Sequence, residues 1–231
     1  MTDRIKPTAT PTLDTPGQAG TATPSPAGDR AAHLGYLAHE IRNPMSTALW
    51  TAELLGRLPE AERGGERGAR LAAICMRSIG RVRLLVEDHL LCERLDAGGY
   101  AVRTEPVPLA EALAEALGRK PADPVPVEAA IDPGLTCQVD RALLVRVLEG
   151  VVGAAAGGAE RVLVEATAAG AMIEVRVLGG PVGSLELPQK GSSSDPRGRA
   201  LALPASRQAA GAIGGRLTVI DGAYLIAIPS A

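Results

Sequence analysis

Phenylalanine is missing from the sequence, and aromatic residues make up only 2% of its 231 positions. Such a chain has few flat side chains on which exposed bases could stack, which disfavours a protein that binds single-stranded nucleic acid. The net charge at pH 7 is only −2, so we expect no strong electrostatic attraction to nucleic acid or to an acidic membrane surface. We therefore predict neither nucleic acid nor a membrane as a partner.

Cysteines and long apolar runs are scarce as well. Cys75, Cys92 and Cys137 are widely spaced and odd in number, so they suggest neither a disulfide framework nor a metal site, and we expect reduced thiols. No run approaches the roughly 18 consecutive apolar residues of a transmembrane helix, and the N-terminal region does not resemble a signal peptide. The expected location is the cytoplasm.

Residues 1–28 consist largely of threonine, proline, alanine and glycine. A segment with so few large apolar side chains cannot bury enough surface to offset the entropy of ordering it. We therefore predict a disordered tail over residues 1–28, with no recognisable sensory domain.

Two long amphipathic helices are predicted next. The first runs from Asp29, a plausible N-cap, to about Leu58, with an apolar stripe at steps of three and four formed by Leu34, Leu37, Ile41, Met45, Ala48, Ala52 and Leu55. The second follows a turn at residues 64–65 and covers residues 67–96, with a stripe formed by Leu71, Cys75, Ile79, Val82, Val86 and Leu90. Each helix would be about 45 Å long, and one antiparallel hairpin cannot cover both stripes. Two copies packed as a four-helix bundle would, so we predict a homodimer.

His39 lies two residues from both Leu37 and Ile41. At about 100° per residue its side chain points roughly 200° away from the apolar stripe, so we expect the imidazole to face solvent next to the Glu40 carboxylate. Pro44 removes the hydrogen bond to the Glu40 carbonyl and is expected to loosen the backbone. An exposed imidazole beside a carboxylate is a candidate nucleophile; the alternative is a solvated histidine with a chance neighbour.

Beyond Gly99 the pattern changes to short alternating elements, which predict an α+β sandwich with one mixed sheet and helices on a single face. The predicted strands cover residues 100–104, 126–131, 161–166, 172–177, 217–220 and 224–228, and the predicted helices cover 109–117, 140–155 and 201–213. The last two strands are expected to form a hairpin across Asp221-Gly222. Residues 179–199 are rich in glycine, serine and proline and are predicted to be a loop.

The run His39-Glu40-Ile41-Arg42-Asn43-Pro44 resembles the H box of the histidine kinases of two-component signalling. The resemblance implies that His39 is the phosphoacceptor and that Glu40 and Asn43 assist phosphoryl transfer. It also implies that residues 29–98 are the dimerisation and phosphotransfer hairpin, and that residues 99–231 form a domain similar to the ATP-binding domain of that family.

The expected nucleotide site departs from that family. Where members carry two asparagines that hold Mg²⁺ and phosphates, this sequence has Gly150 and Ala154, and neither offers the oxygen ligand that Mg²⁺ requires. The aspartate that accepts the adenine amino group aligns with Leu178. The remaining aligned positions of the two glycine motifs are Gly180, Val182, Gly198, Ala200 and Ala202, and the family's phenylalanine-containing box cannot exist here.

From this asymmetry we predict a histidine phosphotransferase with an eroded ATP site, which exchanges a phosphoryl group on His39 with response-regulator receiver domains and binds no cofactor. Receiver domains of that kind supply their own Mg²⁺ and aspartate. The first alternative is a divergent cytoplasmic histidine kinase that uses ATP and Mg²⁺. The second alternative is a non-catalytic scaffold that binds a kinase or a receiver, and a phosphatase role for Glu40 and Asn43 is compatible with each of these.

Overall fold

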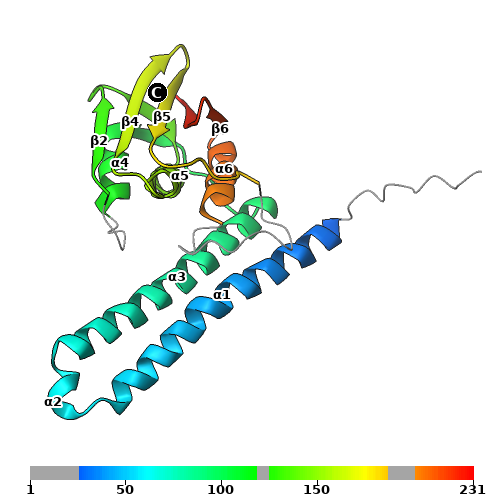
Figure 1. Ribbon diagram of the computed structural model, residues 1–231. Coiled ribbons are helices and arrows are strands. Elements are labelled where there is room, and N and C mark those ends of the chain that lie inside the picture. The colour runs from blue at the N-terminus through cyan, green and yellow to red at the C-terminus, as the bar shows by residue number, and fades with distance from the viewer. Residues whose placement is uncertain (1–25, 119–124, 187–200) are drawn as a thin grey trace, which may run out of the picture.

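The computed structural model describes residues 26–118, 125–186 and 201–231. Two long antiparallel helices come first, α1 (Pro26–Arg57) and α3 (Glu66–Asp96), and the short helix α2 (Glu60–Arg63) joins them at the far end of the hairpin (Figure 1). Helix α1 begins before Asp29, so the prediction that Asp29 caps it is wrong. The helix continues through Pro44 as one element.

The hairpin buries only part of the two apolar stripes that the sequence predicts. Ala48 and Ser78 are buried between the helices, where the Cys75 thiol lies 3.5 Å from the Ala48 carbonyl oxygen. Leu34 and Met45, which were predicted to belong to the core stripe, are exposed. The exposed large apolar side chains of the two helices are Leu34, Met45, Leu49, Trp50, Met76, Ile79, Val86 and Leu90, so Ile79, Val86 and Leu90 of the second predicted stripe are exposed as well.

The C-terminal domain is built on a five-stranded sheet in the order β2-β4-β5-β7-β6, with β2 parallel to β4 and every other pair antiparallel. A separate two-stranded sheet pairs β1 with β3. The strands are β1 (Glu105–Pro108), β2 (Val127–Ile131), β3 (Thr136–Val139), β4 (Val162–Ala169), β5 (Met172–Leu178), β6 (Arg216–Ile220) and β7 (Ala223–Pro229). The predicted fold class, a helical hairpin followed by an α/β sandwich, is confirmed.

Three helices cover one face of the large sheet, namely α4 (Leu109–Gly118), α5 (Arg141–Ala155) and α6 (Ala202–Ala212) (Figure 1). The core between them is aliphatic and includes Leu144, Leu148, Ile173 and Ile226, all fully buried. The hairpin β6–β7 turns at Asp221-Gly222 as predicted, with both residues in the left-handed region (φ 50° and 73°), which two-residue turns of type I′ require.

The segment after α3 differs from its prediction. Residues 100–104 were predicted to form a strand, but they have no ladder partner, and the strand lies at β1. Asp140, the N-cap of α5, explains this, because its carboxylate accepts hydrogen bonds from the Leu143 and Arg103 amides at 3.1 and 2.9 Å. These interactions tie the segment to the start of a helix rather than to a sheet. Strand β3, which pairs with the proline-containing β1, was not predicted.

Helix α3 belongs to both parts of the molecule. Its last turns carry Leu91 and Leu95, which pack against the core of the C-terminal domain, and α6 also lies against α3. Figure 1 shows the domain seated at this end of the hairpin. The two parts therefore share apolar surface rather than meeting only through a linker.

Candidate functional site

His39 is exposed on α1, as the helical step predicts. Arg42 and Asn43, three and four residues later on the same side of the helix, are exposed as well. Thr47 continues this face, and its hydroxyl donates to the Asn43 carbonyl oxygen at 3.1 Å. The imidazole thus lies in a polar, solvent-facing patch that a large partner can reach.

Glu40 does not share this exposure. Its side chain is turned inward with 3% of its surface exposed, and its Oε1 has no hydrogen-bond partner among the described residues. The prediction that the carboxylate faces solvent beside the imidazole is wrong. The reason is the same helical step, because Glu40 follows the buried Leu37 by three residues and therefore lies only about 60° from it around the helix.

Gly150 lies where α5 and α6 touch. A Cβ built on Gly150 would come closer than 3.0 Å to the Ser206 Oγ and to 3.0 Å from the Ala202 carbonyl oxygen. Ser206 is buried, and its hydroxyl donates to the same Ala202 oxygen at 2.7 Å. A side chain at position 150 therefore requires α6 to move, while Ala154, one turn later, is half-buried.

The segment that follows β5 is packed onto the end of α5. The Gly180 amide donates to the Ala155 carbonyl oxygen at 2.6 Å, and a Cβ on Gly180 would come closer than 3.0 Å to the Gly157 carbonyl oxygen. Leu178, the last residue of β5, is half-buried, and Val182 in the segment that follows is exposed.

Tyr224 and Leu203 hold the other end of the same segment. The Gly183 amide donates to the Tyr224 hydroxyl at 2.6 Å, and burial raises the pKa of that tyrosine. Leu203 is buried beside Gly183. Ala202, the first residue of α6, is buried as well, whereas Gly198 and Ala200 lie outside the described residues.

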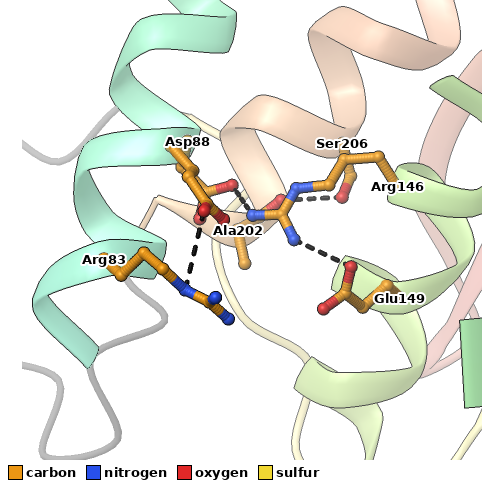
Figure 2. A network of polar contacts seen from close by, with 7 residues as sticks. Arg83, Asp88, Arg146, Glu149, Ala202 and Ser206 are labelled. Carbon is orange, nitrogen blue, oxygen red and sulfur yellow. Dashed lines mark hydrogen bonds and ion pairs between the residues drawn. The ribbon is translucent and has the colours of Figure 1, made fainter. Parts of the chain in front are cut away.

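A buried charge network joins α5 to α3, and the sequence analysis did not identify it. The Arg146 guanidinium contacts the Asp88 carboxylate on α3 and lies 3.0 Å from the Glu149 carboxylate on its own helix (Figure 2). Burial raises the pKa of Asp88 even though Arg146 acts in the opposite direction, and the charges of Asp88 and Glu149 raise the pKa of Arg146 despite its burial. The available signal was an arginine between apolar residues of α5, Val145 and Val147.

Residues 29–98 match the family of His Kinase A (phospho-acceptor) domains. Among solved structures, the chain is similar to the Acinetobacter baumannii histidine kinase AdeS, with a TM-score of 0.62 and 14% identity over 83% of this chain and 97% of that one. It is also similar to full-length ShkA in complex with AMPPNP, with a TM-score of 0.55 and 22% identity over 86% of this chain and 45% of that one. No curated protein sequence matches.

Together these findings show that the chain has the fold of a histidine kinase structure, with the family match confined to residues 29–98. The hairpin is similar to phospho-acceptor domains, and the C-terminal domain has the fold of histidine kinase catalytic domains. No helix in the described ranges is long and apolar enough to cross a membrane. In the same ranges, no cluster of histidine, cysteine, aspartate and glutamate side chains suits a metal ion.

Proposed function

We propose that this chain is a two-component phosphotransfer protein in which His39 carries a phosphoryl group and exchanges it with response-regulator receiver domains. The observation that carries the proposal is the exposed His39 within a family-matched phospho-acceptor hairpin. A neutral imidazole nitrogen attacks phosphorus well, and the open surface around it leaves room for a folded partner. Asn43, exposed one turn away, is placed to contact the same phosphoryl group.

The proposal includes an ATP site that no longer works, and the packing around Gly150 supports it. A nucleotide-bound Mg²⁺ needs oxygen ligands, and position 150 has no space for a side chain that could provide one. Glu149, the nearest carboxylate in the sequence, is already paired with Arg146 at 3.0 Å. Because phosphoryl transfer from ATP depends on positioning and on charge neutralisation by the metal, loss of these ligands removes most of the catalysis.

Titration of the full chain with Mg-ATP tests this half of the proposal. Free ligand stabilises a protein by RT ln(1 + [L]/Kd), so a site with a Kd above the ligand concentration contributes less than about 0.4 kcal/mol. We expect no larger stabilisation by ATP, and rapid labelling of His39 after mixing with a phosphorylated receiver domain. Saturable nucleotide binding, or failure of every receiver domain of the host to label His39, contradicts the proposal.

The second candidate function is an active ATP-dependent histidine kinase. It is favoured by the similarity to AdeS over 83% of this chain, and by ShkA, which holds the ATP analogue AMPPNP in a structure of related fold. This function predicts that the purified chain transfers the γ-phosphoryl group of ATP to its own His39 without a receiver domain. The phosphotransferase proposal predicts no such label.

We also propose that two copies pair through exposed apolar side chains of the hairpin, among them Met45 and Leu49 on α1 and Ile79 on α3. Trp50, the single tryptophan of the chain, is 62% exposed and directly follows Leu49, which is 61% exposed. Large apolar side chains left exposed in such number on two adjacent helices are typical of a protein-protein interface. Replacing Leu49 with glutamate should convert a dimer to a monomer in sedimentation analysis, and Trp50 fluorescence should shift to longer wavelength. A monomeric parent chain contradicts this part.

A further inference from the structure

The two edge strands of the five-stranded sheet differ in their side chains. Strand β2 directly follows Pro126, and its exposed Glu128 forms an ion pair with an arginine at 3.3 Å. Strand β6, at the other edge, pairs only with β7 among the described strands and exposes Val219 and Ile220. Charged residues and prolines protect an edge strand from pairing with another strand, and residues 217–220 include neither.

The free edge of β6 presents the backbone groups of Leu217 and Val219. Opposite residues of antiparallel strands alternate between hydrogen-bonded and non-hydrogen-bonded pairs. In a two-residue hairpin the residues that flank the turn, here Ile220 and Ala223, form a hydrogen-bonded pair. The amide and carbonyl groups of Ile220 and Thr218 therefore point toward β7, whereas those of Leu217 and Val219 point away from it.

These outward backbone groups have no partner in another described element. The Gly215 amide, just before β6, donates to the Ala210 carbonyl oxygen of α6 at 2.8 Å. Within the described ranges, neither the Leu217 nor the Val219 amide donates to a backbone oxygen beyond its own sheet. Both amides and both carbonyl oxygens are therefore available to water or to an added strand.

We propose that this edge is an interaction surface for a second copy of the chain, whose own β6 adds to it in the antiparallel direction. The twofold axis passes through Thr218, perpendicular to the sheet, so the helices of both copies lie on the same face of one continuous sheet. The inference concerns the C-terminal domain alone and does not depend on phosphoryl transfer at His39.

The outward backbone groups select this register. With Thr218 opposite Thr218, Leu217 of each copy lies opposite Val219 of the other, and all of the outward groups form hydrogen bonds. A shift of two residues would place Val219 opposite Gly215, whose amide is already used, or Leu217 opposite Asp221 in the turn. A shift of one residue would put the helices of the two copies on opposite faces.

Charge and side-chain type favour a second copy as the occupant. In the register centred on Thr218, the exposed Arg216 at one end of β6 comes beside the exposed Asp221 at the other end of the second β6. The twofold axis repeats this meeting of opposite charges, and no like charges lie opposite each other. Val219 gains Leu217 as an apolar neighbour, and the two threonines form a cross-strand pair at the centre.

The contact is small, because β6 has only five residues. It is well below the standard interface of about 1,600 Å², so we expect weak association that appears at high protein concentration. If copies also pair through the hairpin, each dimer carries two such edges and association continues beyond the dimer.

Amide exchange of the full chain, followed residue by residue by NMR, tests this pairing. In Leu49→Glu, which is expected to remove pairing through the hairpin, exchange at Leu217 and Val219 should slow at least about threefold between about 20 µM and about 1 mM protein. The parent chain should show the same slowing. Amides of β2 at the opposite edge are the internal reference and should exchange at a constant rate.

A lysine on the edge strand provides a variant test. Val219→Lys places a charge in the contact and should abolish the dependence of exchange on concentration. The matched control is Ala129→Lys, which adds the same charge at an exposed position of β2 and should retain the dependence.

Exchange at Leu217 and Val219 that does not vary with concentration overturns the proposal. If it is slow throughout, another segment already covers the edge, and if it is fast throughout, the edge stays free. Concentration dependence that persists in Val219→Lys, or that is equally large in β2, also overturns it. If Val219→Lys does not fold, the concentration series on the parent chain decides alone.

Discussion

His39 and Gly150 both lie at motif positions named in the sequence analysis, but one is exposed to solvent and the other is enclosed by a neighbouring helix. Around His39 on α1, exposed polar groups leave the side chain open to solvent. Around Gly150 on α5, the neighbouring helix α6 comes so close that even a Cβ has no space. A side chain that reacts with a partner protein, as proposed for His39, must be exposed. Two helices that pack as closely as α5 and α6 need a residue without a side chain at the contact, here Gly150. The comparison shows how one fold can hold one side chain open to solvent while it closes the space around another position.

The largest expected effect comes from removing the reachable group. His39→Gln should reduce incorporation of phosphoryl groups from a phosphorylated receiver domain by more than about a thousandfold, because no other nucleophile replaces the imidazole. Acid-labile radioactive label on the protein measures this. His89→Gln is the matched control and should label like the parent chain. Full labelling of the His39 variant would remove the basis of the comparison.

The contact between α5 and α6 at Gly150 should be destabilised by a larger side chain. Gly150→Ala should lower the free energy of unfolding by about 1–3 kcal/mol, since the new methyl group meets Ser206 and Ala202. Adding Ser206→Ala should recover part of the loss, because the nearest obstructing atom is the serine hydroxyl. Urea unfolding measures both variants. Unchanged stability of Gly150→Ala would mean that α5 and α6 separate easily and that a nucleotide site can open between them.

A smaller effect is expected from the hydroxyl that holds the segment after β5. Tyr224→Phe leaves the Gly183 amide without its acceptor, which should cost about 1–2 kcal/mol of stability. Tyr100→Phe is the control, because its hydroxyl contacts Asp140 only at 3.5 Å, and it should cost less. Equal losses in the two variants would show that the Tyr224 hydrogen bond has no special part in closing this region.

The smallest expected effect concerns two thiols, one in each part of the molecule. Burial raises the pKa of Cys92 to about 12 and that of Cys137 to about 11. Because the unfolded thiols ionise first, their contribution to stability is complete below the unfolded pKa and is lost as pH rises toward the folded values. The loss is about 0.8 kcal/mol per thiol at about pH 9. Cys92→Ala should therefore flatten the alkaline decline seen in unfolding experiments, and an identical pH slope in the variant would contradict the assignment.

Periodicity predicted most of the architecture because burial follows it directly. The two long helices, the helix after Asp140 and the β6–β7 hairpin all lie close to their predicted positions, since caps, apolar spacing and an Asp-Gly turn act locally. Strand β3 and the course of residues 100–104 depend on distant partners, the proline-containing β1 and the Asp140 carboxylate, and were not predicted.

The candidate site shows the same limit. The outward position of His39 follows from its place two residues after Leu37. The inward position of Glu40 follows in the same way from its place three residues after Leu37, about 60° from it around the helix. The Arg146–Asp88 contact joins residues 58 positions apart, and its only local signal is an arginine between two buried valines of α5. The closeness of Ser206 to Gly150 likewise depends on where α6 comes to rest.

Helix α3 has a practical consequence for anyone who wishes to cut this protein into modules. Leu91 and Leu95 belong to the hairpin by chain order but fill the interior of the C-terminal domain. A recombinant fragment that begins after the helix would therefore expose the aliphatic hollow that they occupy and would tend to aggregate. A fragment that starts near residue 85 retains Leu91 and Leu95 and therefore keeps this part of the core filled. A chimaera that takes one half from a relative should likewise keep the end of α3 together with the C-terminal domain.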